Sequence, residues 1–230
     1  MTPAAHRPAG ASGAAWLALL AVALLAATGA HAGVSPDSAL ARTGGVCASE
    51  GSTLVQTRSV RIYSKRGVKV ACHRRSGRRT VFTDPVSVCD ACLTNRIRTA
   101  ATMVAYDLSY TGRRGVFYNL QVLNAKTGRI IRDIFQGEFS SNIGIRREAR
   151  LADLEVRANG SIVWISDVRE YDALNRFVQT YEVRRADTAA GGSTNVLLDS
   201  SPEIDPTSLT LDGLRAHWAR GGERVSAPVR

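Results

Sequence analysis

The sequence predicts an all-β fold, and three observations lead to this prediction. Apolar and polar residues alternate with a period of two in many short runs, which is typical of strands with one buried face. These runs are rich in β-branched and aromatic residues, and turn sequences separate them. Only one stretch, 145–153 (IRREARLAD), has a composition that favours a helix. It leads directly into Leu154-Glu155-Val156, so we expect at most a short helical turn there.

The expected strands follow one another from about residue 54. Clear alternation is present in 60–63, 68–73, 116–122, 177–183 and 208–211. Glycine-containing turns are predicted at Lys65-Arg66-Gly67, Thr127-Gly128, Asn159-Gly160, Gly191-Gly192, Asp212-Gly213 and Gly221-Gly222. We therefore expect residues 54–230 to form a single all-β domain.

Residues 1–32 are predicted to be a secretory signal peptide. Positions 14–27 form an uncharged apolar run of 14 residues, and the tripeptide 30–32 (AHA) has the small-x-small pattern that signal peptidase accepts. The run is shorter than the roughly 20 residues of a membrane-spanning helix, which favours cleavage over a retained anchor. Residues 33–53 are small and polar, and we expect a linker or a closing edge strand there.

The chain contains four cysteines, Cys47, Cys72, Cys89 and Cys92, all beyond the signal segment. An even number of cysteines in an exported chain predicts structural disulfides. We expect the pairs Cys47–Cys72 and Cys89–Cys92 because each closes a local loop. The first would stabilise the fold by about 3 kcal/mol through its constraint on the unfolded chain.

Two other uses of these cysteines are disfavoured. The spacing of Cys89-Asp90-Ala91-Cys92 occurs in thiol–disulfide exchange motifs, but no helix start follows it to lower a thiol pKa. A zinc site formed by Cys72, His73, Cys89 and Cys92 would need two adjacent residues of a strand to face the same ion. We expect neither a metal nor a cofactor.

Four expected strands carry an aromatic residue in a similar setting. They are Val60-Arg61-Ile62-Tyr63, Met103-Val104-Ala105-Tyr106, Ser161-Ile162-Val163-Trp164 and Leu214-Arg215-Ala216-His217-Trp218. The aromatic residues are separated by 43, 58 and 54 positions. A four-stranded propeller blade takes about 40–50 residues, so this spacing favours a propeller-like repeat.

On the phrases 154–164 (LEVRANGSIVW) and 204–218 (IDPTSLTLDGLRAHW), the chain resembles uncharacterised bacterial secreted proteins with degenerate β-propeller-like repeats. The resemblance covers about residues 54–230 and implies a propeller-like fold of about four degenerate blades. The last unit, 207–230, is one strand short, and 39–48 could supply that strand and close the ring. The alternative arrangement is a β-sandwich or an irregular barrel.

Common catalytic signatures are absent from the sequence. It contains no Gly-x-Ser-x-Gly, no His-Glu-x-x-His, no phosphate-binding glycine loop and no dinucleotide fingerprint. His73 and His217 are expected to be structural. Two acidic clusters could form an acid/base pair or a calcium site, although solvated turns are the favoured interpretation. They comprise Asp167, Glu170 and Asp172, and Asp199, Glu203, Asp205 and Asp212.

The charge distribution is uneven, within a formal net charge of +10. Residues 51–83 contain nine basic side chains and no acidic one. Arginine forks suit phosphate and carboxylate groups, so this segment is a candidate site for an anionic polymer or a cell-envelope component. The candidate binding residues are Arg61, Lys65, Arg66, Arg74, Arg75, Arg78 and Arg79. The alternative is a solvated edge hairpin whose charge prevents aggregation.

The first functional hypothesis is a secreted, non-catalytic binding or structural module without an assigned ligand. A second is an extracellular hydrolase or lyase on a propeller scaffold, with residues 199–212 as the place to look, and the sequence leaves open whether the protein is an enzyme. A third is a binder of anionic cell-surface polymers through the basic segment 58–79. Nucleic acid is not an expected partner for an exported chain.

Overall fold

The computed structural model describes residues 47, 50–83, 96–112, 115–139, 147–171, 176–187 and 195–230, all within one unit, Pro36–Arg230. These residues form strands and turns without a helix, so the all-β prediction is confirmed for them. None of the described segments is a helix long and apolar enough to cross a membrane. The predicted signal peptide, 1–32, lies outside the described residues.

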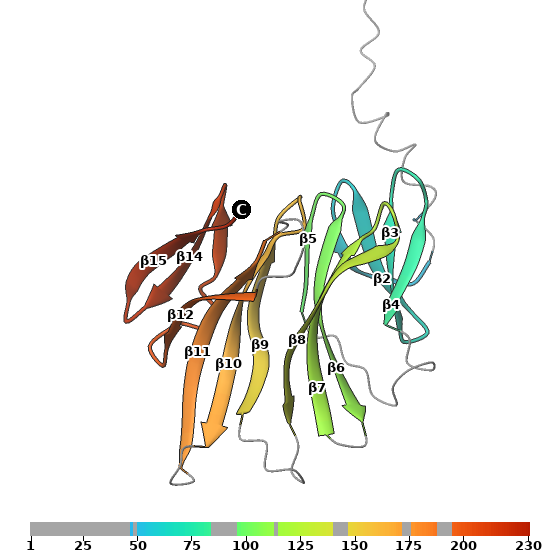
Figure 1. Cartoon of the computed structure of the whole chain (residues 1–230). Helices are drawn as coiled ribbons and strands as arrows, with labels where there is room; N and C mark the ends of the chain where they lie inside the picture. Colours follow the sequence, from blue (N-terminus) through green and yellow to red (C-terminus); the bar gives the residue numbers. More distant parts are fainter. Residues whose placement is uncertain are drawn as a thin grey trace, which may run out of the picture. The chain divides into compact units, whose positions relative to one another are not determined.

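The strands form four antiparallel sheets, and in each sheet the strands lie in chain order (Figure 1). The first sheet contains β1 (Ser52–Gln56), β2 (Val60–Lys65), β3 (Val68–His73) and β4 (Arg79–Thr83). The second contains β5 (Ile97–Ala100), β6 (Met103–Gly112), β7 (Gly115–Asn124) and β8 (Arg129–Phe139). The third contains β9 (Arg147–Val156), β10 (Ile162–Tyr171), β11 (Phe177–Ala186) and β12 (Asn195–Ser201). The fourth contains β13 (Thr210–Asp212), β14 (Arg215–Arg220) and β15 (Glu223–Pro228).

This distribution bears on the barrel and the sandwich, two of the arrangements that the sequence left open. None of the four sheets closes on itself, so the irregular barrel is not the arrangement of the described residues. The strands also occupy four sheets instead of the two of a sandwich. Short connections explain the pattern, because antiparallel neighbours need only a tight turn and each hairpin extends the sheet by one strand.

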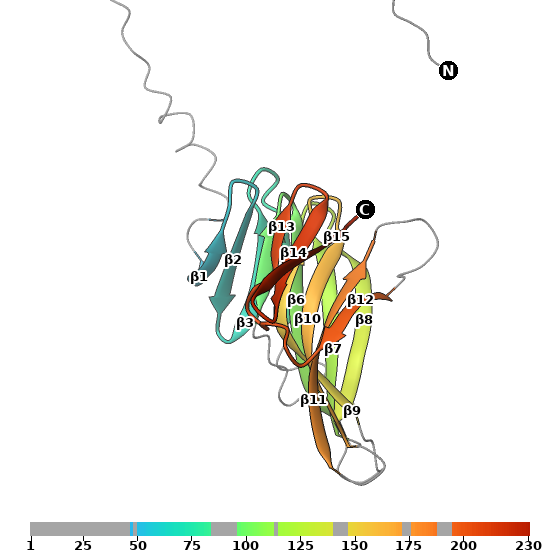
Figure 2. The same cartoon turned by 90° about the vertical axis from the view of Figure 1, so that its left-hand side faces the viewer.

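A hydrophobic cluster links each sheet to the next. Val60 and Ile62 of the first sheet share a core with Val104 and Tyr106 of the second. Corresponding clusters join the second sheet to the third and the third sheet to the fourth. The strands of the second and third sheets are mostly 10 or 11 residues long, and they reach beyond the shorter strands of the first and fourth (Figures 1 and 2).

The four aromatic residues of the sequence pattern occupy equivalent strands. Tyr63, Tyr106, Trp164 and Trp218 lie on β2, β6, β10 and β14, each the second strand of its sheet. All four side chains are buried, with at most 2% of their surface exposed. Tyr106, Trp164 and Trp218 belong to the cores between sheets, whereas Tyr63 packs against the half-cystines Cys47 and Cys72.

Several predicted turns are confirmed by their backbone geometry. Arg66 and Gly67 both have positive φ, 53° and 82°, and join the paired residues Lys65 and Val68, which is the geometry of a two-residue type I′ hairpin. Gly160 has φ 87°, and a Cβ atom there would lie 2.6 Å from Cδ1 of Ile131, so that side chain would have to move. The predicted turn at Gly191-Gly192 lies outside the described residues.

At most a short helical turn was expected within 145–153, and no helical turn forms in the part that the structure describes. Residues 147–153 belong to strand β9, which pairs along its length with β10. Helix propensity is a weak preference, and pairing with the buried strand β10 overrides it.

At the amino-terminal side, Ser52 and Thr53 belong to β1 and not to a linker. The proposed closing strand, 39–48, lies outside the described residues except for Cys47, and the fourth sheet has three strands in the described part of the chain.

The predicted disulfide between Cys47 and Cys72 is present. Both half-cystines are buried and pack with Tyr63 and Val70 on the outer side of the first sheet. The bond therefore fastens the segment before β1 to strand β3. Cys89 and Cys92 lie outside the described residues, so their pairing stays a prediction.

Candidate anion-binding site

The turn between β3 and β4 forms one wall of an open hollow. The backbone N–H of His73 donates to the carbonyl of Arg78 at 2.8 Å, and the N–H of Gly77 donates to the carbonyl of His73 at 2.8 Å. Nδ1 of His73 lies 2.8 Å from Oγ of Ser76. Gly77 has φ 69°, which a side chain would disfavour, so glycine permits this compact turn. Within this turn His73 is buried and Arg75 is exposed.

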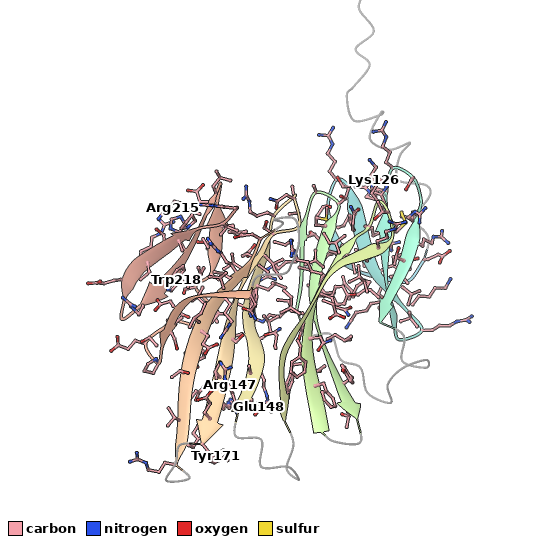
Figure 3. All side chains as sticks on the ribbon, in the orientation of Figure 1. Lys126, Arg147, Glu148, Tyr171, Arg215 and Trp218 are labelled. Carbon is pink, nitrogen blue, oxygen red and sulfur yellow. A yellow bond between two sulfur atoms is a disulfide. The ribbon has the colours of Figure 1, made fainter. Side chains whose placement is uncertain are left out.

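The opposite wall comes from the turn between β7 and β8 in the second sheet. Oδ1 of Asn124 accepts a hydrogen bond from the backbone N–H of Lys126 at 3.0 Å and shapes this turn. Nη1 of Arg78 donates to the carbonyl of Thr127 at 3.0 Å and so joins the two turns. Figure 3 shows Lys126 beside the first sheet.

The resulting hollow has a volume of about 780 Å³. It is lined by His73, Arg75, Ser76, Gly77, Arg78 and Lys126. No carboxylate lines it, and three of its six residues carry a permanent positive charge. We call it the basic hollow.

The cations of the basic hollow are only weakly neutralised. In the described part of the chain, the guanidinium of Arg75 and the ammonium of Lys126 have no ion-pair partner. Arg78 bonds a backbone carbonyl and keeps its full charge. Burial lowers the pKa of His73, and the positive charges of Lys126 and Arg75 lower it further. An anion in the basic hollow would reverse this effect and favour the protonated imidazole.

Arg61 does not belong to the exposed basic surface, although it was a candidate binding residue. Its side chain is 6% exposed and donates hydrogen bonds to Oγ1 of Thr53 at 2.9 Å, to the carbonyl of Gly51 at 3.2 Å and to the carbonyl of Cys47. The guanidinium also lies over the ring of Tyr63, 4.9 Å from its centroid. These contacts join Cys47, Gly51 and Thr53 to strand β2.

The other candidate cations lie at different places on the first sheet. Lys65 and Arg79 both form ion pairs with Glu50 at 2.9 Å. The hydrogen bond from Lys65, together with the charges of both cations, lowers the pKa of the Glu50 carboxyl. Nη1 of Arg74 donates to the carbonyl of Thr57 at 2.9 Å. Arg66 is exposed at the apex of the β2–β3 turn.

Of the seven candidate binding residues, the structure brings Arg75 and Arg78 together in the basic hollow. Sequence reasoning missed His73 and Lys126 as members of it. The predicted turn at Thr127-Gly128 was the one sequence feature that indicated an exposed position for Lys126. The proximity of Lys126 to Arg78 could not be predicted, because 48 positions separate the two residues and only the packing of two sheets brings them together.

Two of the four acidic residues in 199–212, Asp199 and Asp205, are engaged in local contacts. Asp199 accepts hydrogen bonds from Nε1 of Trp218 at 2.8 Å and from Nη1 of Arg220 at 3.0 Å. Asp205 accepts from the backbone N–H and the hydroxyl of Thr207, both at 2.8 Å, and these bonds lower the pKa of its carboxyl. A lowered pKa is the opposite of what a general acid near neutral pH requires.

The other acidic cluster forms ion pairs. Asp167 pairs with Arg169 at 2.9 Å, and Glu170 pairs with Arg147 at 2.6 Å. Asp172 lies outside the described residues. Among the residues that the structure does describe, no group of three or more His, Cys, Asp or Glu side chains is placed to hold a metal ion.

Comparison of the chain with protein-family models, with curated proteins and with solved structures finds no match. Functional inference therefore depends on the geometry of the residues described above.

Proposed function

We propose that the protein is an exported, non-catalytic binding module, and that its ligand is an anionic polymer held at the basic hollow. The observation that carries this proposal is the convergence of Arg75, Arg78 and Lys126 from two sheets on one open surface without a carboxylate. Such an arrangement attracts anions because its charges add at short range instead of cancelling.

The shape of the basic hollow supports a polymer more than a small molecule. Sites for small molecules are concave and bury most of the ligand surface, with mainly apolar walls. The basic hollow is open, and Arg75, Arg78 and Lys126 present long, exposed, charged side chains to it. Arginine forks on an exposed surface suit repeated carboxylate, sulfate or phosphate groups along a flexible chain.

Export to an oxidising compartment is part of the same proposal. The buried disulfide Cys47–Cys72 supports it, because such bonds persist mainly outside the reducing cytosol. The expected signal peptide, 1–32, is the second support.

The scaffold of the proposed module is propeller-like. Four antiparallel sheets in chain order, each packed on the next and each with a buried aromatic residue on its second strand, support this interpretation. Propeller blades pack in the same sequential way around a central axis. The rival hypothesis, a hydrolase or lyase acting through residues 199–212, gains no support from Asp199 and Asp205, whose carboxylates bind neighbouring groups.

The proposal is tested by charge reversal with a matched control. The test variant is Arg75→Glu/Arg78→Glu/Lys126→Glu, and the control is Arg176→Glu/Arg215→Glu/Arg224→Glu, which reverses the same number of charges at exposed positions outside the basic hollow. Binding of the oxidised protein to heparin and to polygalacturonate is measured at several salt concentrations, with the melting temperature as the check on folding.

We expect the test variant to bind both polymers at least tenfold more weakly than the control variant, because each reversal removes one attraction and adds one repulsion. Equal weakening in the two variants would show that only net charge matters, and it would overturn the assignment of the basic hollow. Unchanged binding in both variants would overturn the proposed function itself.

A further inference from the structure

A second cavity lies where the second and third sheets diverge. Towards one end, the interface between these sheets is closed by apolar side chains such as Leu120, Leu154 and Ile162. Towards the Tyr171 end of β10 most of the facing side chains are polar, and a cavity of about 180 Å³ remains. It is lined by Phe135, Gln136, Arg147, Ala149, Trp164, Ser166, Glu182, Arg184 and Asn195. We call it the inter-sheet cavity.

Strand register explains why these side chains meet. Trp164 and Ser166 are two residues apart on β10, so they lie on the same face of the third sheet. Their cross-strand partners on β11 are Arg184 and Glu182. Gln136 belongs to β8 of the second sheet, and it receives a hydrogen bond on Oε1 from the hydroxyl of Ser166 at 3.2 Å.

The acceptor groups of the inter-sheet cavity are already engaged. Glu182 is 8% exposed, and its two carboxylate oxygens accept from Nη2 of Arg147 at 2.6 Å and from Nε of Arg184 at 2.7 Å. Nη1 of Arg184 donates to Oδ1 of Asn195 at 3.0 Å. Outside the lining, Arg147 also pairs with Glu170 at 2.6 Å, so the two arginines are balanced by two carboxylates.

Two donors of the lining are buried without a partner among the described residues. They are Nε1 of Trp164, a residue that is only 1% exposed, and Nε2 of Gln136. The other described tryptophan, Trp218, donates its Nε1 hydrogen to Asp199 at 2.8 Å. Buried polar groups are almost always hydrogen-bonded, because an unsatisfied one costs about 1–3 kcal/mol.

We propose that the inter-sheet cavity is a binding site for a carboxylate group. The unpartnered groups are both N–H donors, and the lining also contains two guanidinium groups, so the complementary ligand brings oxygen acceptors, which a carboxylate supplies in pairs. The donors of Trp164 and Gln136 bind the carboxylate oxygens. Arg147 and Arg184 each retain an N–H group that is not used by Glu182, Glu170 or Asn195.

The volume limits the size of the bound group. About 180 Å³ is the space of roughly six water molecules, well below that of a drug-sized site. The inter-sheet cavity therefore admits one small carboxylate at a time, either of a small molecule or of one unit of a longer acidic chain. It is separate from the basic hollow, since the two share no lining residue.

The indole N–H of Trp164 is a direct reporter of this site. The chain has three tryptophans, so a ¹H–¹⁵N correlation spectrum of the full chain has at most three indole signals. The variants Trp164→Phe and Trp218→Phe assign the indole signals of Trp164 and Trp218, because each variant lacks one of them. Sodium acetate is the carboxylate probe, with sodium chloride at equal ionic strength and acetamide as controls. Polygalacturonate is a separate arm that represents polymer-borne carboxylates.

We expect acetate to shift the Trp164 indole signal saturably while the Trp218 signal stays in place. Chloride and acetamide should leave both signals unchanged. A shift with acetate but not with polygalacturonate identifies a small-molecule carboxylate, and a shift with both identifies an acidic chain as a second source. Absence of a saturable acetate shift, or an equal shift with acetamide, would overturn the proposal. Because this titration uses the wild-type protein, its outcome does not depend on whether a variant folds.

A substitution localises the binding. Gln136→Glu keeps the acceptor for Ser166 and replaces the donor with an acidic oxygen, so acetate affinity should fall at least tenfold. Gln56→Glu, an exposed position on β1, makes the same charge change elsewhere and should leave the affinity unchanged. Equal affinities in the two variants would remove Gln136 from the site. The triple variant of the basic hollow should retain the acetate response, which separates this inference from the proposed function.

Discussion

Removing the disulfide between Cys47 and Cys72 should destabilise the protein substantially. The bond joins residues 25 positions apart and anchors the segment before β1 to the buried strand β3. In the chain-entropy description, closing a loop of this length lowers the entropy of the unfolded chain. The free energy of unfolding rises by about 3–4 kcal/mol as a result. Both half-cystines also pack in the cluster with Tyr63 and Val70, so alanine substitution removes some buried contacts as well.

The test is the variant Cys47→Ala/Cys72→Ala, with Cys89→Ala/Cys92→Ala as the matched control. Urea unfolding of the oxidised proteins, followed by circular dichroism, gives the free energy of unfolding and its dependence on urea. We expect a loss of about 3–4 kcal/mol and a fall in melting temperature on the order of 10 °C for the first variant. The urea dependence should become steeper because the unfolded chain expands.

One result would refute this reasoning. If the first variant loses less than about 1 kcal/mol, the disulfide is not a major constraint on the unfolded chain. The contacts of Arg61 with Cys47, Gly51 and Thr53 would then be sufficient to hold the segment before β1.

Three further predictions follow from individual side chains. A sulfated polymer should bind more tightly as the pH falls from about 7.5 to 5.5. In the free protein, burial and nearby cations lower the pKa of His73, and a bound anion favours protonation of its imidazole. His73→Gln should flatten the pH profile in a binding titration, and a wild-type affinity independent of pH would contradict the prediction. Gly160→Ala should destabilise the fold by about 1–3 kcal/mol, since φ is 87° and the new Cβ would lie 2.6 Å from Cδ1 of Ile131. Gly213→Ala, at φ 54° with open space around it, should lower the thermal stability less, and an equal loss in both would exclude the contact as the cause. Glu50→Gln should release two cations and strengthen heparin retention with little change in melting temperature; unchanged retention would show that these cations lie outside the binding surface.

The fold was predictable where local sequence determines local structure. Alternating residues such as 68–73 and 177–183 became strands, and the Lys65-Arg66-Gly67 turn adopted the expected positive φ angles. Residues 147–153 were the exception. Their composition favours a helix, but a neighbouring strand supplies backbone partners along their whole length, and local sequence carries no information about that neighbour.

The candidate site was predictable only in its chemical character. The basic composition of 51–83 is visible in the sequence, whereas the role of each cation is not. Glu50, one position outside that segment, neutralises Lys65 and Arg79, and Arg61 turns inward to bind the backbone. Which arginine is available to a ligand depends on where its neighbours in space lie.

The amino-acid order alone was enough to predict the all-β class, many of the strands, most of their turns, one disulfide and an excess of positive charge, because these depend mainly on residues close together along the chain. The packing of successive sheets decided the rest. It placed Lys126 beside Arg78 and aligned Gln136 of one sheet with Trp164 of the next. Contacts of this kind join segments remote in sequence, and they exist only when the apolar faces of two sheets are buried against each other.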